Sequence, residues 1–354
     1  MKTKPVAILG GVGFIGVNLA HRLLAAGERV RAFDNLSRPG VERNAQWLRD
    51  IHGDRFELCV GDVRNANAVA AALIDASAVF HLAAQGAVTQ SLEDPRDDFS
   101  VNALGTMNVL EALRRNPGNA PLVFTSTSQV YGRLGHVPID EGPLRYQPSD
   151  PGLAATGFSE TQPLEFCSPC GCSKGCADQY VLDYAKTFGL RTVVMRMSCI
   201  YGPRQFGSED QGWVAHFVKR SLAGQAIMIY GSGKQVRDLL FVDDAIDALL
   251  LARKRIDELS GRAFNLGGGP DLAVSLLELL RLLEDVLGQK AEVVFSPERL
   301  ADQRYYVSDT RKFSDATGWS ARTSLRQGLR QLYQWLSVPA ERRPPLFAPA
   351  ETRA

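Results

Sequence analysis

Two patterns of apolar and polar positions alternate along residues 5–198. Short apolar runs bounded by glycine, acidic or other polar residues predict buried strands, and longer stretches with apolar residues at helical spacing predict helices. The predicted strands are 5–10, 29–34, 56–62, 78–83, 121–127 and 192–198, and the predicted helices are 14–27, 69–76, 97–115 and 170–188. Strands that alternate with helices favour a parallel sheet with right-handed crossovers, so we expect an α/β fold with a Rossmann-type doubly wound sheet.

The pattern becomes less regular after Tyr201. Further helices are predicted over residues 210–223, 242–254, 274–288 and 323–336. We expect a Rossmann domain and a smaller, discontinuous C-terminal lobe that binds the substrate. The Rossmann domain is predicted to comprise residues 1–197 and 240–271, and the lobe residues 198–239 and 272–338.

Two segments carry no predicted helix or strand. Residues 132–168 are rich in Gly and Pro. Because so long a connection inside a compact domain usually has a function, we expect it to form a wall of the active site. Residues 339–354 are rich in Pro and charged residues, and we expect them to form a disordered tail.

The overall composition excludes several classes of function. Of the 354 residues, 45% are hydrophobic and 22% are charged, which is typical of a soluble globular protein. The formal net charge of +1 gives no sign of nucleic acid or another polyanion as a partner. No apolar run approaches the roughly 18 residues of a membrane helix, and the N-terminal segment has no signal-peptide pattern. We therefore expect no membrane association and a cytoplasmic location.

The segment ILGGVGFIG (8–16) joins the first predicted strand to the first predicted helix. Its glycines, Gly10, Gly13 and Gly16, allow a tight turn in which backbone N–H groups meet a pyrophosphate at the helix N-terminus. The next strand ends at Asp34. A carboxylate at that point accepts hydrogen bonds from the adenosine ribose and repels a 2′-phosphate, so the pattern predicts NAD as the cofactor.

Two further positions bear on the cofactor. Arg38 follows Asp34 closely, which keeps NADP open as an alternative. Gly61-Asp62-Val63 ends the third predicted strand, where a carboxylate can meet the adenine amino group.

Six cysteines are present, and four of them crowd into the segment 167–176 with the spacing CxxCxCxxxC. Without a secretory signal, a disulfide framework is not expected. The spacing fits no standard zinc or iron–sulfur pattern, and Cys172 and Cys176 share a helix face from which Cys170 points away. We therefore predict that no metal binds at Cys167, Cys170, Cys172 and Cys176.

Several segments occur in the order found in the extended short-chain dehydrogenase/reductase family, which acts on nucleoside-diphosphate sugars. They are GGVGFIG (10–16), HLAAQ (81–85), VNALGT (101–106), TSTSQVYG (125–132), SPCGCSKG (168–175), IYGPRQ (200–205), RDLLFVDD (237–244) and FNLGGG (264–269). The chain resembles this family over residues 5 to about 335. Within it, the chain most resembles the CDP-tyvelose (CDP-paratose) 2-epimerases, through AVTQSLEDPRDDF, SDPGLAATGFSETQPLEF, GCSKGCADQYVLDYAKTFGL and MSCIYGPRQFGSEDQGWVAHF.

This resemblance implies an epimerase with a tightly held NAD. A sugar hydroxyl is oxidised to a ketone, the keto sugar is presented again, and hydride returns to its opposite face. The implied catalytic residues are Thr127, Lys174, which binds the nicotinamide ribose, and Cys170, which stands where the family has the tyrosine of its YxxxK pair. The lysine often found before VYG in 2-epimerases is Gln129 in this chain.

The resemblance also implies two sets of contact residues. The residues expected to bind NAD are Gly10, Gly13, Phe14, Ile15, Gly16, Asp34, Asn35, Asp62, Val63, Leu82, Ala83, Ala84, Gln85, Asn102, Thr125 and Lys174. The residues expected to bind the nucleoside-diphosphate sugar, with a CDP-sugar favoured, are Gln85, Ser128, Gln129, Ser198, Arg204, Gln211, Arg237 and Arg304. Arg237 and Arg304 match positions that clamp the pyrophosphate, which the planar guanidinium suits.

Cys170 leaves the chemistry open between three hypotheses. A thiol next to an ammonium has a lowered pKa, so Cys170 can act as the base directly or through a water molecule. Its sulfur, however, lies several ångström nearer the backbone than a phenol oxygen, and proton transfer needs hydrogen-bond contact. Alternatively the base has moved, to Thr127, Ser128 or the long loop, and the reaction is a dehydration or decarboxylation. In the third hypothesis the protein binds a sugar nucleotide without turnover.

The family resemblance also predicts a homodimer, or a tetramer, through a four-helix bundle made from helices 97–115 and 170–188. The side chains expected on that surface are Met107, Val109, Leu110, Tyr180, Val181 and Tyr184, unless they belong to the core. The 4,6-dehydratases of the family carry Asp-Glu after the catalytic Thr, and Ser128-Gln129 lacks both carboxylates, which argues against a dehydratase.

Overall fold

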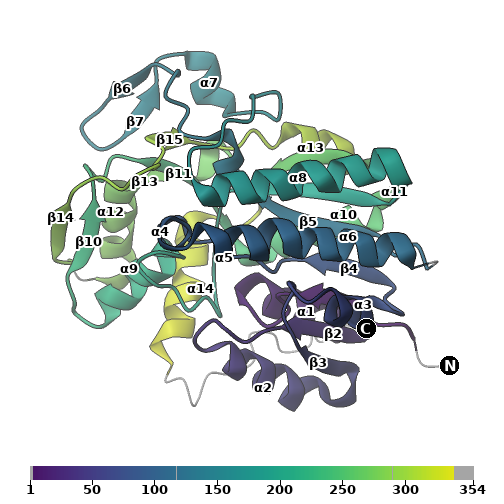
Figure 1. Ribbon diagram of the computed structural model, residues 1–354. Helices are drawn as coiled ribbons and strands as arrows, with labels where there is room; N and C mark the ends of the chain where they lie inside the picture. The colour runs from purple at the N-terminus through teal and green to yellow at the C-terminus, as the bar shows by residue number, and fades with distance from the viewer. Residues whose placement is uncertain (1–2, 117, 289, 339–354) are drawn as a thin grey trace.

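A seven-stranded parallel sheet forms the centre of the computed structural model, which describes residues 3–116, 118–288 and 290–338 (Figure 1). The strand order is β12-β8-β5-β4-β1-β2-β3. The strands are β1 Val6–Leu9, β2 Val30–Asp34, β3 Phe56–Val60, β4 Ala78–His81, β5 Leu122–Thr127, β8 Thr192–Met197 and β12 Arg262–Leu266. The predicted Rossmann-type sheet is therefore confirmed.

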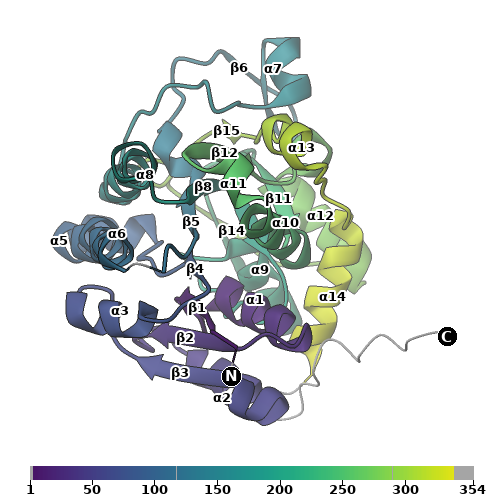
Figure 2. The ribbon, with the colours of Figure 1, turned by 90° about the vertical axis from the view of Figure 1, so that its right-hand side faces the viewer.

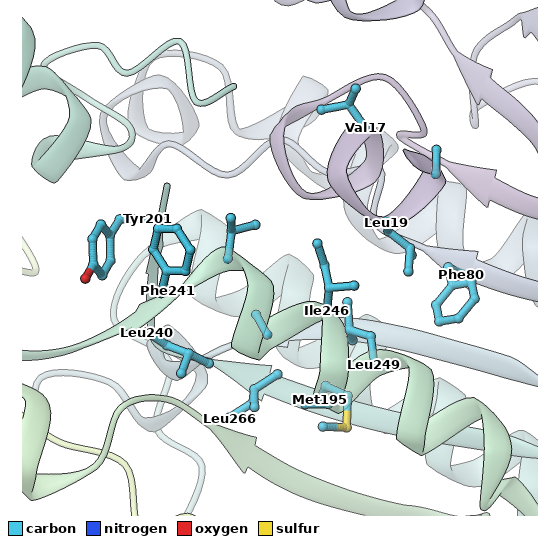
Figure 3. Close-up of a cluster of buried hydrophobic side chains, with 14 of the residues drawn as sticks. Val17, Leu19, Phe80, Met195, Tyr201, Leu240, Phe241, Ile246, Leu249 and Leu266 are labelled. Carbon is cyan, nitrogen blue, oxygen red and sulfur yellow. The ribbon is translucent and has the colours of Figure 1, made fainter. Parts of the chain in front are cut away.

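Helices cover both faces of this sheet (Figure 2). One face carries α3 (Ala66–Leu73), α6 (Gly105–Arg115) and α8 (Pro169–Phe188), and the other carries α1 (Phe14–Ala25), α2 (Val41–His52), α10 (Val242–Lys254) and α11 (Ile256–Leu259). Between the sheet and α1 and α10, apolar side chains interdigitate, among them Val17, Leu19, Ile246 and Leu249 from the helices and Phe80, Met195 and Leu266 from the strands (Figure 3).

The predicted helix 97–115 consists of three helical pieces. They are α5 (Pro95–Phe99), the π-helical turn η2 (Ser100–Leu104) and α6, and the short α4 (Val88–Glu93) precedes them. A π turn widens the helix by one residue and often occurs at functional sites. In this protein it carries Asn102, whose role is described below.

Smaller sheets lie beyond the carboxyl ends of the central strands (Figure 1). One contains β13 (Ala273–Ser275), β11 (Val236–Phe241), β15 (Tyr305–Tyr306) and β9 (Cys199–Tyr201), and another pairs β10 (Ile227–Tyr230) with β14 (Val293–Ser296). The accompanying helices are α9 (Trp213–Leu222), α12 (Leu276–Leu287), α13 (Arg311–Thr317) and α14 (Leu325–Ser337), with the 3-10 turns η1 (Gly53–Arg55) and η4 (Pro270–Leu272) elsewhere. The division into two domains stays a prediction, and residues 339–354 lie outside the described residues.

The long connection 132–168 follows the 3-10 turn η3 (Ser128–Tyr131) and is more ordered than predicted. It contains the hairpin β6 (Ile139–Glu141) and β7 (Tyr146–Pro148) and the helix α7 (Pro151–Thr156). Its Leu134 and Phe158 are buried in a separate apolar cluster with Tyr306. The connection does not line the cavity described below, and the expectation that it forms an active-site wall stays a prediction.

Among the residues that the structure describes, no helix is both long enough and apolar enough to span a bilayer.

Candidate active site

A cavity of about 1010 Å³ opens at the carboxyl edge of the central sheet. It lies where the strand order reverses, because β1 has β2 on one side and β4 on the other, and open α/β sheets bind ligands at such a point. Most of the expected cofactor residues line it. They are Gly10, Gly13, Phe14, Ile15, Gly16, Asp34, Asn35, Val63, Leu82, Ala83, Ala84, Gln85, Thr125 and Lys174.

The turn after β1 presents the N-terminus of α1 to this cavity. Gly10 has a φ of +76°, and a Cβ there would lie 2.7 Å from the Ala83 nitrogen. A Cβ on Gly16 would overlap the Gly10 carbonyl oxygen. Gly13, the N-cap of α1, would meet only that oxygen, at 3.3 Å, so its other side is open. The turn thus leaves room for a pyrophosphate at the positive end of the helix dipole.

Asp34 ends β2 at the cavity wall. Its carboxylate accepts hydrogen bonds from the backbone N–H groups of Val12 at 3.3 Å and Leu36 at 3.0 Å. Burial raises the pKa of this carboxyl, and the backbone N–H groups oppose the rise. Arg38 and Arg43 also line the cavity. The end expected to hold the adenosine ribose therefore combines one fixed carboxylate with two guanidinium groups.

Asp62 is turned toward its neighbours on the surface rather than into the cavity. Its carboxylate accepts hydrogen bonds from the Arg64 guanidinium at 2.8 and 2.7 Å and from the Asn35 amide at 3.0 Å. The hydrogen-bonded Arg64 holds the pKa of Asp62 well below its usual range. Arg64 lines the cavity whereas Asp62 does not, so the contact of Asp62 with adenine stays a prediction.

Asn102 lies beneath the cavity and is 1% exposed. Its side chain exchanges hydrogen bonds with the main chain of Gln85, at 3.0 and 2.9 Å, and donates to Asp98 at 3.1 Å and to Ser173 at 3.0 Å. These contacts show that Asn102 fixes the loop after β4 against α8. Asn102 does not line the cavity, and its contact with the cofactor stays a prediction.

Lys174 reaches from α8 to the end of β5. Its Nζ donates to the carbonyl oxygen of Thr125 at 2.6 Å and lies 4.3 Å from the centre of the Phe124 ring. Burial lowers the pKa of the ammonium group to about 8. The helix is set in place by Ser168, whose hydroxyl caps its N-terminus by accepting from the Gly171 N–H at 3.1 Å.

Cys170 lies one helical turn before Lys174, and its side chain also lines the cavity. Burial raises the pKa of this thiol to about 12, and the nearby Asp98 carboxylate adds to the rise. Thr127 ends β5 on the same wall, where its Oγ1 accepts from the Gln129 N–H at 3.2 Å and keeps its own O–H free to donate. The three expected catalytic residues therefore share one side of the cavity.

Five of the eight residues expected to bind the sugar nucleotide line the cavity: Gln85, Gln129, Ser198, Arg204 and Gln211. The Oε1 atom of Gln129 is buried and has no hydrogen-bond partner within the described ranges, so a ligand hydroxyl can donate to it. The guanidinium of Arg204 lies over the ring of Trp47, 3.2 Å from its centre, which fixes its direction.

The other three residues lie outside the cavity wall. Ser128 is 7% exposed within η3. Arg237 is buried and donates to Asp302 Oδ1 at 2.6 Å, and Arg304 is exposed with its guanidinium 5.5 Å from the Tyr146 ring centre. An ion pair already engages Arg237, so the pyrophosphate clamp from Arg237 and Arg304 stays a prediction.

Sequence reasoning missed several polar residues of the cavity wall, namely Arg43, Arg64, Gln205 and Lys219. It also missed α2, which carries Arg43 and Trp47, the residue whose ring lies under the Arg204 guanidinium. The available signal was the helical spacing of Val41, Ala45 and Leu48, which are buried on the inner face of α2.

The cysteines are free and differ in exposure. Cys172 is exposed, Cys167 and Cys176 are half-buried, and Cys170 is buried. Within residues 3–116, 118–288 and 290–338, no group of three or more His, Cys, Asp or Glu side chains is arranged to hold a metal ion.

The residues of the cavity fit NAD. The open side of Gly13 accommodates a pyrophosphate, the Asp34 carboxylate is held by backbone N–H groups at the ribose end, and Lys174 is fixed at the far end beside Thr125. Together they span the cavity from the turn after β1 to the end of β5.

Comparison with known proteins points to the same chemistry. Residues 6–267 match the model of the NAD dependent epimerase/dehydratase family. CDP-paratose 2-epimerase of Salmonella typhi is 42% identical over 337 residues, which cover 93% of this chain and 98% of that protein. Among solved structures, UDP-glucose 4-epimerase of Thermus thermophilus in complex with NAD has a TM-score of 0.78 and 30% identity, covering 94% and 98% of the two chains. UDP-glucuronic acid 4-epimerase of Bacillus cereus, in complex with UDP-glucuronic acid and NAD, has a TM-score of 0.80 and 25% identity with the same coverage.

Proposed function

The chain belongs to the NAD dependent epimerase/dehydratase family, and we propose that within it the protein epimerises a CDP-linked sugar in the manner of CDP-paratose 2-epimerase. The observation that carries this proposal is the 42% identity to that enzyme over nearly the whole of both chains. The cavity supports it, because Thr127 and Lys174 stand at one end and the glycine turn at the other.

When bound, NAD would supply the hydride acceptor and donor for the sugar carbon. The residues of this chain bind and orient the reactants. Asp34 holds the adenosine ribose, Lys174 donates to the nicotinamide ribose, and the Thr127 hydroxyl donates to the reacting sugar oxygen. Gln129 and Arg204 orient the sugar nucleotide from the other side of the cavity.

Cys170 stands where the family has its tyrosine. We propose that the Cys170–Lys174 pair, rather than a phenol, supplies the acceptor for the hydroxyl proton. A lyase is not favoured, because neither Ser128 nor Gln129 offers a carboxylate beside Thr127 to act as acid or base.

We also propose that the protein is a homodimer. The face made by α5, η2 and α8 exposes Phe99, Leu104, Tyr180 and Phe188, which are 56%, 45%, 43% and 47% exposed. Of the side chains predicted for this surface, Val109, Leu110 and Val181 are fully buried in the core instead, and Tyr184 donates to Glu111 at 2.8 Å. Exposed aromatic side chains on neighbouring helices are typical of a subunit interface. The free cysteines fit a reducing compartment, and we propose the cytoplasm.

The test is to incubate the purified protein with CDP-, UDP-, GDP- and dTDP-sugars and to identify the products by NMR and mass spectrometry. We expect an isomer of unchanged mass from a CDP-sugar, formed by wild-type protein and by Lys186→Met at the exposed end of α8, and not by Lys174→Met. A product of changed mass, or an isomer from only another nucleotide, would contradict the proposal.

A further inference from the structure

Oxidation of a sugar hydroxyl needs a group that accepts the hydroxyl proton while hydride leaves. Most titratable side chains of the cavity wall lie at the adenosine end, at or after the ends of β2 and β3, on α2 or on α5; they are Asp34, Arg38, Arg43, Arg64 and Asp97. Arg204, after β9, and Lys219, on α9, also line the cavity, but they come from the substrate side rather than from β5 or α8. Among the described residues of β5 and α8 that line the cavity with Thr127, the titratable side chains are Cys170 and Lys174. The identity of the acceptor therefore reduces to a choice between this thiol and this amine.

The surroundings of Cys170 keep its thiol protonated. A helix N-terminus normally favours a thiolate, and Cys170 lies in the first turn of α8. Here, however, the side chain is 3% exposed and the Asp98 carboxylate is near, and burial raises the thiol pKa to about 12. In the described part of the chain, Lys174 Nζ makes no hydrogen bond to the sulfur and donates to the Thr125 carbonyl instead. The charge of Lys174 opposes the rise in the thiol pKa but is the smaller effect, so the protonated thiol is favoured.

The surroundings of Lys174 make its ammonium group lose a proton more readily than an exposed lysine does. Its Nζ is buried, makes no salt bridge within the described residues and has the Phe124 ring at 4.3 Å. The charged groups nearest to it are already engaged: Asp178 pairs with Arg196, and Asp98 accepts from Ser173 at 2.5 Å and from Asn102.

On β4, the buried His81 is neutral, because burial lowers its pKa to about 3. Burial is also the leading cause that lowers the Lys174 pKa to about 8, against the opposing effects of Cys170, Asp178 and Asp98. A buried ammonium without a carboxylate partner loses its proton more readily than one in water.

We propose that the neutral amine of Lys174 is the proton acceptor of this enzyme, and that it receives the proton through a water molecule held where related enzymes have the phenol of tyrosine. This inference rests on the proposed epimerase function. A thiol is much smaller than a phenol, and Cys170 lines the cavity of about 1010 Å³, so we place the water beside its sulfur. The Thr127 hydroxyl, the Lys174 amine and the sugar hydroxyl would supply the polar partners that a buried water requires.

The step balances in atoms and electrons. The C–H bond of the sugar carbon breaks and its electron pair leaves with the hydride to NAD, while the C–O bond becomes a ketone. The hydroxyl proton passes to the water, and the water passes a proton to the Lys174 nitrogen. Return of the hydride to the other face reverses each transfer, so neither oxidant nor base is consumed.

The proton count explains why the exchange of tyrosine for cysteine is tolerated. A tyrosinate beside an ammonium and a thiol beside an amine hold the same number of protons and the same net charge. They differ in which atom accepts the next proton, as in any coupled pair of titrating groups. In this cavity the acceptor is nitrogen.

The decisive experiment compares two variants of the holoenzyme, Lys174→Arg and Cys170→Tyr/Lys174→Arg. Arginine keeps the positive charge and the donors for the ribose but does not lose its proton. We expect Lys174→Arg alone to lower kcat by at least about 100-fold, since general bases contribute about that much or more. The kcat of the double variant Cys170→Tyr/Lys174→Arg should be at least about tenfold higher than that of Lys174→Arg, because the phenol restores a proton acceptor. Equal activity of the two variants, or near wild-type activity of Lys174→Arg, would overturn the proposal.

The matched controls separate the base from its neighbours. Lys186→Arg, at the exposed end of α8, should behave as wild type. Cys170→Ala is a direct test of the other candidate group and not a control: a loss of about 100-fold or more in kcat would assign the base to the sulfur and overturn the proposal. NAD content, measured on denatured protein, should be equal in wild type and Lys174→Arg, which shows that cofactor binding is not the cause of the loss.

A readout independent of turnover is the titration of Lys174 itself. In holoenzyme labelled with 13C at the lysine ε-carbon, the signal absent from Lys174→Arg should titrate with a midpoint near pH 8. It should move to higher pH in Cys170→Tyr, where a phenolate stabilises the ammonium. A midpoint that stays near the ordinary lysine value would overturn the proposal. Because the titration needs no substrate, it distinguishes failure of this inference from failure of the CDP-sugar assignment.

Discussion

Arg196 and Asp178 are joined by two hydrogen bonds of 2.9 Å, and their side chains are only 5% and 0% exposed. Arg196 belongs to β8, and Asp178 lies one turn beyond Lys174 on α8. The guanidinium also donates to the Tyr131 hydroxyl at 3.2 Å, which in turn donates to Asn265 at 2.7 Å. This buried pair therefore fixes α8, with Lys174 on it, against the sheet.

Removing one partner of this pair should be strongly destabilising. Asp178→Ala leaves the Arg196 cation buried without its carboxylate, and we expect the free energy of unfolding to fall by about 3–5 kcal/mol. Asp247→Ala is the matched control, because Asp247 pairs with Arg22 at 2.9 Å on the surface and its loss should change the value by less than about 1 kcal/mol. Denaturant unfolding measures both, and similar small changes in the two variants would contradict the prediction.

The turn after β1, which contains Gly10, Gly13 and Gly16, gives a second prediction. A methyl group on Gly16 would overlap the Gly10 carbonyl oxygen, so Gly16→Ala should shift the turn. We expect a loss of about 1–3 kcal/mol in stability and a lower NAD content in the purified protein. Gly135→Ala is the control, because a Cβ there meets nothing within 4 Å. Full NAD occupancy in Gly16→Ala would show that the turn adapts.

Asp34 should control the choice between NAD and NADP. In Asp34→Ala the carboxylate that repels a 2′-phosphate is gone, while Arg38 and Arg43 remain at the cavity wall. We expect the affinity ratio of NADP to NAD to rise by about 10- to 100-fold, the usual value of one hydrogen bond to a charged group. Titration calorimetry on stripped protein measures it. Asp62→Ala should leave the ratio unchanged, because Asp62 faces Arg64 instead.

A buried histidine pair predicts a dependence of stability on pH. His21 Nδ1 lies 2.9 Å from His52 Nε2, and burial, followed by His52, lowers the pKa of His21 from 6.5 to about 4. Between these two values the unfolded chain binds more protons than the folded one, so stability falls as the pH drops from 6.5 to 4. This contribution is on the order of 3 kcal/mol.

The measurement compares unfolding free energies across that pH range in His21→Gln, in the exposed His136→Gln and in wild type. The slope should become shallower in His21→Gln alone. An unchanged slope in that variant would assign the acid sensitivity to other groups.

The proposed dimer interface is the face made by α5, η2 and α8. Tyr180→Asp introduces a charge among Phe99, Leu104 and Phe188, and light scattering should then give the mass of a monomer where wild type gives a dimer. Phe295→Asp, on β14 and 59% exposed, is the control and should keep the dimer mass. A monomer in wild type, or a dimer in Tyr180→Asp, would argue against this interface.

The sequence predicted the parts of this protein that depend on local patterns. The six predicted strands, the glycine turn and the capped helix carrying Cys170 and Lys174 were recognised because their signals lie within a few consecutive residues. Helix α2 was missed because its apolar face is narrow, with Arg43 and other polar residues between the apolar ones. The hairpin within 132–168 was missed because it is stabilised by distant residues such as Tyr306.

Individual side-chain roles were less predictable, because they depend on neighbours from other elements. Asp62, predicted to contact the adenine, accepts hydrogen bonds from Arg64, a contact that the motif did not reveal. Asn102, predicted to contact the cofactor, lies on the π turn and donates to Gln85, Asp98 and Ser173, which the motif also did not reveal. Motif positions alone do not reveal such competition.

The small side chain at position 170 also has a pharmacological consequence. Under the proposal that Cys170 stands where related enzymes have a tyrosine, a sugar-nucleotide analogue with a compact ring at the reacting carbon would place that ring beside Cys170, in space that the phenol fills in those relatives. The same analogue would collide with that phenol in them. The proposed exchange of one residue would therefore let such an analogue inhibit this enzyme selectively over relatives that carry the tyrosine.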